Sequence, residues 1–192
     1  MGTATRQAAT EARKAQITEA TIAVLSTRGY AATTFEAICE QAGLSSKRLI
    51  SYHFSSKDEL FAAVAARVVT DASAFMRSAL DSAVGGRELL SAYIRSSLEF
   101  IAVHPDHVRA LQQIIFNAVP VWGHETDAAV ERLAALFADG QRTGTFRHFE
   151  PRVMATAVRA AIDSAAPLLL DGFDPQVCGD ELSDLFDRAT RP

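Results

Sequence analysis

The chain has 192 residues, 48% of them hydrophobic, so it can bury a substantial core without disulfides or a structural metal. Its formal net charge is −4 at pH 7. The two cysteines, Cys39 and Cys178, are far apart in the sequence, and this spacing argues against a secreted disulfide scaffold, a metal knuckle and a redox pair. No apolar run approaches the roughly 18 residues that span a bilayer, and no apolar stretch follows the first basic residues as in a secretory signal. We therefore expect a reduced, cytoplasmic location and no membrane partner.

The charge is unevenly distributed along the chain. Residues 1–57 contain seven basic and four acidic side chains, a balance of +3, so the remainder carries −7. All three lysines, Lys14, Lys47 and Lys57, fall in that first segment. Because the electrostatic footprint of phosphate binding is local, a basic head on an acidic body indicates a small DNA-binding segment joined to a larger one with another task.

Apolar residues recur at spacings of three and four along the whole chain, so the sequence predicts an all-α fold of about nine helices. The first helix is expected over residues 11–28, with Gly29 as its C-terminal cap. Thr33 and Glu36 have the spacing of a capping box, in which Thr33 caps a second, short helix that ends at about Ala42.

A glycine turn and a third helix follow. Gly43 is suited to the turn, and Ser45 or Ser46 can cap a helix that carries Ile50. Helix, glycine turn and helix is the arrangement that places the second of the two helices in the major groove of DNA. Such a helix carries hydrogen-bonding and cationic groups at its N-terminal end, which here are Ser45, Ser46, Lys47 and Arg48.

The remaining helices are longer. Ser56 and Glu59 form a second capping box before a helix that runs towards Ala83. Glycine and proline breaks then separate helices expected over residues 87–103, 106–118, 125–143, 151–170 and 176–189. We divide the chain into a flexible arm over 1–10, a helix-turn-helix DNA-binding domain over 11–55, and an effector-binding and dimerisation domain over 56–192.

Short motifs follow the first helix in a fixed order: Gly29-Tyr30, Thr33-Thr34, Ile38, Ala42-Gly43, Tyr52-His53-Phe54, Ser56-Lys57 and Leu60. In this order they resemble the DNA-binding signature of TetR-family bacterial transcriptional regulators. The resemblance covers residues 17–61 directly, and the total length and the tail of long helices also agree with the family.

The resemblance implies two groups of DNA contacts. Base-edge candidates are Ser46, Lys47 and Arg48. Phosphate candidates are Thr33, Thr34, Tyr52, His53 and Lys57, and a mobile arm with Arg6, Arg13 and Lys14 can reach the backbone or the minor groove. The segment from Gly43 to Phe54 is one residue longer than the commonest family spacing, which affects the register of Ser45 and Ser46. Ser51 stands where many members have a tyrosine and leaves a smaller donor.

The resemblance also implies an effector cavity in the second domain, with contacts from Tyr93, Phe116, Asn117 and Trp122, and a homodimer through the last two helices. Core packing is the competing interpretation for each aromatic, and burial within one chain is the competing interpretation for the last two helices. His104 and His107 are three apart, but Pro105 between them is unsuited to a helical metal site.

We therefore predict a nucleoid-associated repressor that binds a palindromic operator as a dimer and is released by an unidentified small molecule, without a cofactor. No catalytic motif suggests an enzyme. The alternative is an all-α small-molecule-binding or protein-interaction module without specific DNA binding. The salt dependence of the affinity distinguishes these two functions, because only binding through several phosphates weakens steeply as the salt concentration rises.

Overall fold

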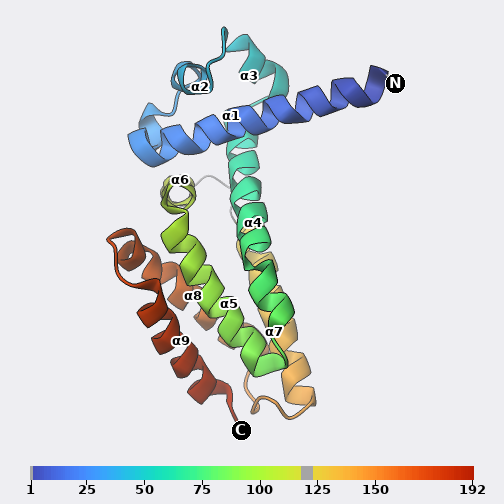
Figure 1. Ribbon diagram of the computed structural model, residues 1–192, viewed down its shortest axis with the longest axis vertical. Helices are drawn as coiled ribbons and strands as arrows, with labels where there is room; N and C mark the ends of the chain where they lie inside the picture. The colour runs from blue at the N-terminus through green and yellow to red at the C-terminus, as the bar shows by residue number, and fades with distance from the viewer. Residues whose placement is uncertain (1, 118–122) are drawn as a thin grey trace. The chain divides into compact units, whose positions relative to one another are not determined.

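The computed structural model describes the backbone of residues 2–117 and 123–192. Within these ranges the chain contains nine α-helices and no strand (Figure 1), which confirms the predicted all-α fold. The helices are α1 (Gly2–Ala32), α2 (Phe35–Ala42), α3 (Arg48–His53), α4 (Lys57–Ser82), α5 (Gly86–Val103), α6 (Pro105–Phe116), α7 (Gly123–Arg142), α8 (Pro151–Leu170) and α9 (Pro175–Thr190). The bounds of α8 agree with the prediction, and those of α5 and α9 agree to one residue.

The chain forms two compact units. The head unit contains residues up to Val69 together with Asp106–Gly123, and the body unit contains Thr70–Pro105 and His124–Pro192. The first half of α4 and most of α6 therefore belong with the head, which the expected boundary at residue 55 does not anticipate. Residues 2–10 are helical as the first turns of α1, and their expected mobility as an arm stays a prediction.

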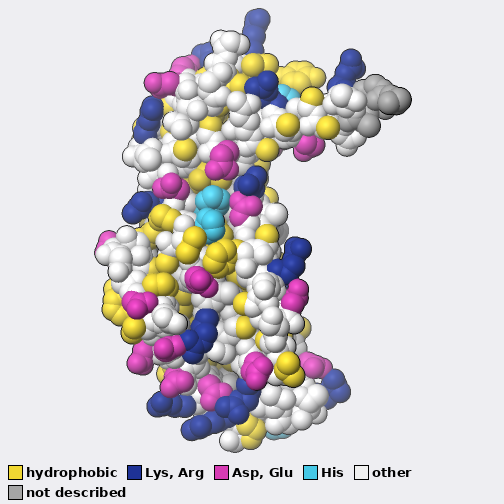
Figure 2. Space-filling model, in the orientation of Figure 1, with side chains coloured by type: hydrophobic (Ala, Val, Ile, Leu, Met, Phe, Trp, Pro, Cys, Tyr) yellow, Lys and Arg dark blue, Asp and Glu magenta, His cyan; other side chains and the backbone are white. Residues whose placement is uncertain are grey.

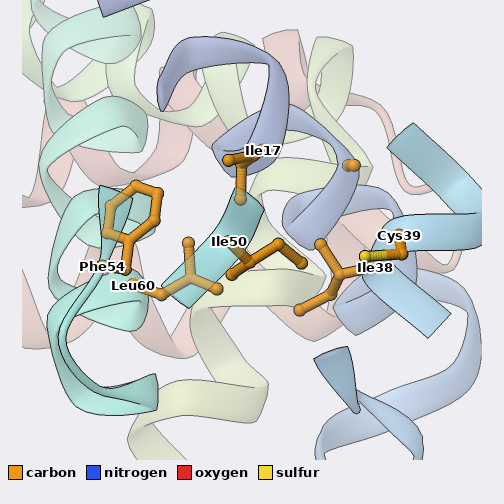
Figure 3. Close-up of a cluster of buried hydrophobic side chains, with 7 residues drawn as sticks. Ile17, Ile38, Cys39, Ile50, Phe54 and Leu60 are labelled. Carbon is orange, nitrogen blue, oxygen red and sulfur yellow. The ribbon is translucent and has the colours of Figure 1, made fainter. Parts of the chain in front are cut away.

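Side chains from four helices form the core of the head unit. Ile17, Ile38, Ile50 and Leu60 are fully buried, and Phe54 is nearly so. Figure 3 shows them gathered around Ile50, with Ile17 from α1 above it, Ile38 from α2 to the right and Leu60 from α4 to the left in the view. Burying each such side chain stabilises the fold by about 1.5–3 kcal/mol. Helix α3 has six residues, and its N-cap Lys47 makes no side-chain capping hydrogen bond, so its place depends on the packing of Ile50.

Two glycines with positive φ set the turns of the head unit. Gly29 (φ 77°) interrupts the helical path of α1, as the predicted cap requires. Gly43 (φ 64°) adopts the left-handed conformation after α2, and its N–H donates to the carbonyls of Cys39 and Glu40. The predicted turn at Gly43 is thereby confirmed.

The capping box at Thr33 is a wrong prediction. The N-cap of α2 is Thr34, whose hydroxyl accepts the Ala37 N–H at 3.1 Å. Thr33 is fully buried and donates its hydroxyl to the Gly29 carbonyl at 2.7 Å, because the turn after Gly29 extends through it. The capping box at Ser56 is present, since Ser56 Oγ accepts the Glu59 N–H at 3.0 Å.

In the body unit, α5 packs against α8 and α9. Arg87 on α5 forms a bidentate ion pair with Asp187 on α9, in which each of the two hydrogen bonds is 2.7 Å long. By length and composition alone, α8 is the one helix of the described residues that is apolar enough to cross a membrane. One face of α8 is buried, with Val158 and Ile162 at its centre, so we interpret it as a core helix of this unit.

Candidate DNA-binding surface

An open hollow lies on the head unit where α2, α3 and the start of α4 meet. Its lining consists of Thr33, Thr34, Phe35, Glu36, Lys47, Arg48, Ser51 and Lys57. Six of these eight are DNA-binding candidates from the sequence, although they come from three separate elements. Figure 2 shows Lys and Arg side chains on the surface over α2 and α3, at the top of the view. The hollow therefore presents cationic and hydroxyl groups together, as an anion such as phosphate requires.

The start of α3 exposes its polar side chains. Ser45, Ser46, Lys47 and Arg48 are all solvent-exposed. The N-cap of α3 is Lys47, so the predicted N-cap at Ser45 or Ser46 is wrong. Ser46 Oγ nevertheless accepts the Arg48 N–H at 3.2 Å, directly before the first turn. No ion pair of Arg48 is found among the described residues, so its guanidinium is available for bidentate hydrogen bonding.

Lys47 is held by an acidic side chain from α2. Its ammonium lies 2.7 Å from Glu36 Oε1, and both groups are exposed. The hydrogen bond from Lys47 lowers the pKa of the Glu36 carboxyl and raises the pKa of Lys47. Sequence reasoning missed this pair because it placed Glu36 in a capping box. The pair spans the turn between two helices, where no local spacing reports a contact.

Lys57, the first residue of α4, is half-buried over two rings. Its Nζ lies 4.7 Å from the centroid of Tyr30 and 5.2 Å from that of Phe61, and these rings are 5.5 Å apart. Burial lowers the pKa of Lys57. The aromatic faces hold the ammonium in place, so Lys57 lines the hollow as a positioned cation at a helix N-terminus.

The remaining phosphate candidates differ in accessibility. Thr34 is exposed at the N-terminus of α2, whereas Thr33 is fully buried with its hydroxyl bonded to the backbone, so Thr33 presents no free hydroxyl to DNA. Tyr52 is 81% exposed and His53 half-buried, with their rings 5.0 Å apart and perpendicular. Ser51 is exposed and donates a long hydrogen bond of 3.4 Å to the Lys47 carbonyl.

Comparisons with known proteins place this surface in a family. The family model described as bacterial regulatory proteins, tetR family, matches residues 17–64, which include α2, α3 and all but the first 15 residues of the helix before them. Residues 17–64 therefore form a DNA-binding domain of the TetR type. It is 28% identical over 155 residues to the HTH-type transcriptional activator FasR of Mycolicibacterium smegmatis, which covers 80% of this chain and 70% of FasR. The chain is accordingly a transcriptional regulator with a DNA-binding domain.

Solved structures agree with the TetR assignment. A TetR-like transcriptional regulator from Rhodococcus sp. RHA1 is 26% identical, with a TM-score of 0.74 over 92% of this chain and 94% of that one. A regulator from Saccharomonospora viridis, solved in complex with choline, has a TM-score of 0.78 over 94% of this chain and 97% of that one. At 23% identity the second likeness shows the TetR fold alone.

The four effector candidates fall in different parts of the chain. Tyr93 on α5 belongs to the body unit, where its hydroxyl accepts a hydrogen bond from Arg159 Nη1 at 3.0 Å. Phe116 and Asn117 are exposed at the end of α6 in the head unit, and Trp122 lies outside the described residues. Their role in binding an effector stays a prediction. Among the described residues, no group of three or more His, Cys, Asp or Glu side chains is placed to hold a metal ion.

Proposed function

We propose that this TetR-family regulator is a repressor in the cytoplasm, associated with the nucleoid, that binds a palindromic operator as a homodimer and is released by a small-molecule effector. The observation that carries the proposal is the hollow of the head unit. It gathers Lys47, Arg48 and Lys57 with the hydroxyls of Thr34 and Ser51 beside an exposed helix start.

In this proposal α3 enters the major groove. Arg48 reads a base edge, because a guanidinium pairs bidentately with guanine O6 and N7. Ser45, Ser46 and Lys47 contact neighbouring bases. Phosphates are held by Thr34, Ser51, Tyr52, His53 and Lys57, and Arg6, Arg13 and Lys14 on the first turns of α1 approach the DNA backbone.

The dimer is proposed to form through the outer faces of α8 and α9. Although most of their apolar stripe is buried within the chain, Val153, Leu168, Val177 and Leu185 remain exposed. Four large apolar side chains on two neighbouring helices favour a protein partner over water. A two-fold dimer places the two copies of α3 about 34–36 Å apart, one helical turn of DNA.

Release by an effector follows from linkage. An effector that prefers a conformation with a different spacing of the two heads weakens DNA binding by the factor with which DNA weakens effector binding. The choline complex of the Saccharomonospora viridis regulator supports a ligand-binding role for the fold. We assign the effector contacts to Tyr93, Phe116, Asn117 and Trp122.

A second candidate function is activation. It is favoured by the relative FasR, which is named an activator. Repression and activation share the same DNA contacts and differ in where the operator lies relative to the promoter. Transcription in vitro from the natural promoter distinguishes them, since a repressor lowers the yield of transcript and an activator raises it.

The DNA-binding proposal is tested with a pair of charge-matched variants. Lys47→Ala/Arg48→Ala removes two cations from the hollow, whereas Arg132→Ala/Arg142→Ala removes two exposed cations from α7 in the body unit, away from α8 and α9 in the sequence. Fluorescence anisotropy with a selected duplex measures the affinity over a series of salt concentrations. The first variant should lose specific binding, and the control should bind as the wild type does. Equal affinities of the wild type and the Lys47/Arg48 variant would refute the proposal.

A further inference from the structure

The kink at Gly29 is tied to a distant helix by a side chain. The N–H of Tyr30 donates to Gln113 Oε1 at 3.0 Å, and Gln113 lies in the last turn of α6, 83 positions along the chain. Both residues are half-buried in the head unit. Gly29 has a non-helical backbone, with φ 77°, and the next amide, the N–H of Tyr30, is the group that donates to the Gln113 carboxamide oxygen.

The Gly29–Tyr30 turn positions two groups that line the hollow. The Tyr30 ring lies under the ammonium of Lys57 at 4.7 Å. The Tyr30 carbonyl accepts the Thr33 N–H at 3.1 Å, and the Thr33 hydroxyl donates to the Gly29 carbonyl. These two bonds fix the backbone between the turn and Thr34. A displacement of Tyr30 therefore moves both Lys57 and the N-terminus of α2.

Gln113 also makes a second hydrogen bond, through its backbone. Its backbone carbonyl accepts a hydrogen bond from the side chain of Asn117 at 2.8 Å, at the end of the same helix. The bond to Tyr30 requires an acceptor, because the backbone N–H can only donate. A half-buried N–H that loses its partner is costly, so an apolar side chain of similar size would release the turn.

We propose that Gln113 is a positioning residue for DNA binding: its carboxamide oxygen fixes the Gly29–Tyr30 turn, so that Lys57 and Thr34 face the same stretch of phosphate backbone. The inference rests on the proposed DNA-binding function. It adds to that function a residue outside the helix-turn-helix, on a helix to which we assign no DNA contact.

The test compares three glutamine variants on the palindromic duplex that the wild-type protein selects. Gln113→Leu removes the acceptor at similar size, Gln113→Glu keeps an acceptor oxygen, and Gln112→Leu makes the same change at the neighbouring half-buried position. We expect Gln113→Leu to bind about 5- to 30-fold more weakly, from the usual worth of one partly buried hydrogen bond. The slope of log affinity against log salt should fall by about one, since one phosphate contact is lost. Gln113→Glu should recover most of the affinity and slope, and Gln112→Leu should match the wild type.

The hydrogen bond is also observed directly. The chain has three tyrosines, so labelling with ¹⁵N-tyrosine yields three amide signals, and that of Tyr30 is assigned by substitution. In Gln113→Leu the Tyr30 signal should shift and its amide should exchange faster with solvent, while Tyr52 and Tyr93 stay unchanged. Circular dichroism checks that the variant remains folded.

The outcomes separate the two proposals. If the wild type selects no duplex, the proposed function fails, and this inference fails with it. If the wild type binds but Gln113→Leu keeps its affinity and salt slope, only the role of Gln113 is overturned. The same holds if Gln113→Leu and Gln113→Glu are weakened equally, because the acceptor oxygen then plays no part.

Discussion

Replacing Ile50 with alanine should release α3 from the head unit. The Ile50 side chain is 0% exposed to solvent, and Ile50 is the one buried residue of the six in α3. The change removes three carbons, worth about 0.8 kcal/mol each on transfer from water, and leaves a cavity among Ile17, Ile38 and Leu60. We expect a loss of about 2–5 kcal/mol, a large share of the roughly 5–15 kcal/mol that stabilises an ordinary domain.

Leu49→Ala is the matched control for Ile50→Ala. It removes the same number of carbons from the neighbouring position in α3, but Leu49 is only partly buried. Urea denaturation followed by circular dichroism measures the free energy of unfolding, and hydrogen exchange of the backbone amides at positions 50 and 54 reports on α3 itself. Ile50→Ala should cost at least about twice as much as Leu49→Ala. Equal costs would show that packing of Ile50 does not hold α3.

Three further changes act on caps and charges of the head unit. Ser56→Ala removes the acceptor of the Glu59 N–H and should lower the free energy of unfolding by about 1 kcal/mol in urea denaturation. An unchanged free energy of unfolding would show that this cap does not stabilise the fold. Glu36→Gln releases Lys47, so DNA affinity measured by anisotropy should rise and its salt dependence steepen; weaker binding would contradict this. Burial lowers the pKa of Lys57, so its charge is lost at a lower pH than that of an ordinary lysine. DNA affinity should therefore decline as pH rises through that lowered pKa, and Lys57→Arg, which stays charged, should bind with a flatter pH profile.

Much of the helical framework was predictable because its signals are local. The bounds of α8 follow from Pro151 at its start and the glycine break after Leu170, and Gly43 marks the end of α2 by its left-handed backbone. Such signals lie within a few residues of the boundary that they define. Thr33 and Thr34 show the limit of this reasoning, since both are good caps and only the length of the preceding turn decides between them.

Contacts between elements were not predictable in the same way. The charge split and the helix-turn-helix spacing indicated Lys47, Arg48 and Lys57, but neither shows that Glu36 holds Lys47 or that Tyr30 supports Lys57. The bond from Tyr30 to Gln113 joins positions 83 residues apart. Pairings of this kind depend on how helices pack, which a single sequence does not report.

Selection of random duplex DNA by the purified protein, at near-physiological salt, tests the central claim most directly. The DNA-binding proposal predicts enrichment of one palindrome, bound by a dimer with an affinity that falls steeply as salt rises. A folded, dimeric protein that enriches no sequence, or whose binding is insensitive to salt, would contradict it and favour a binding module without specific DNA recognition.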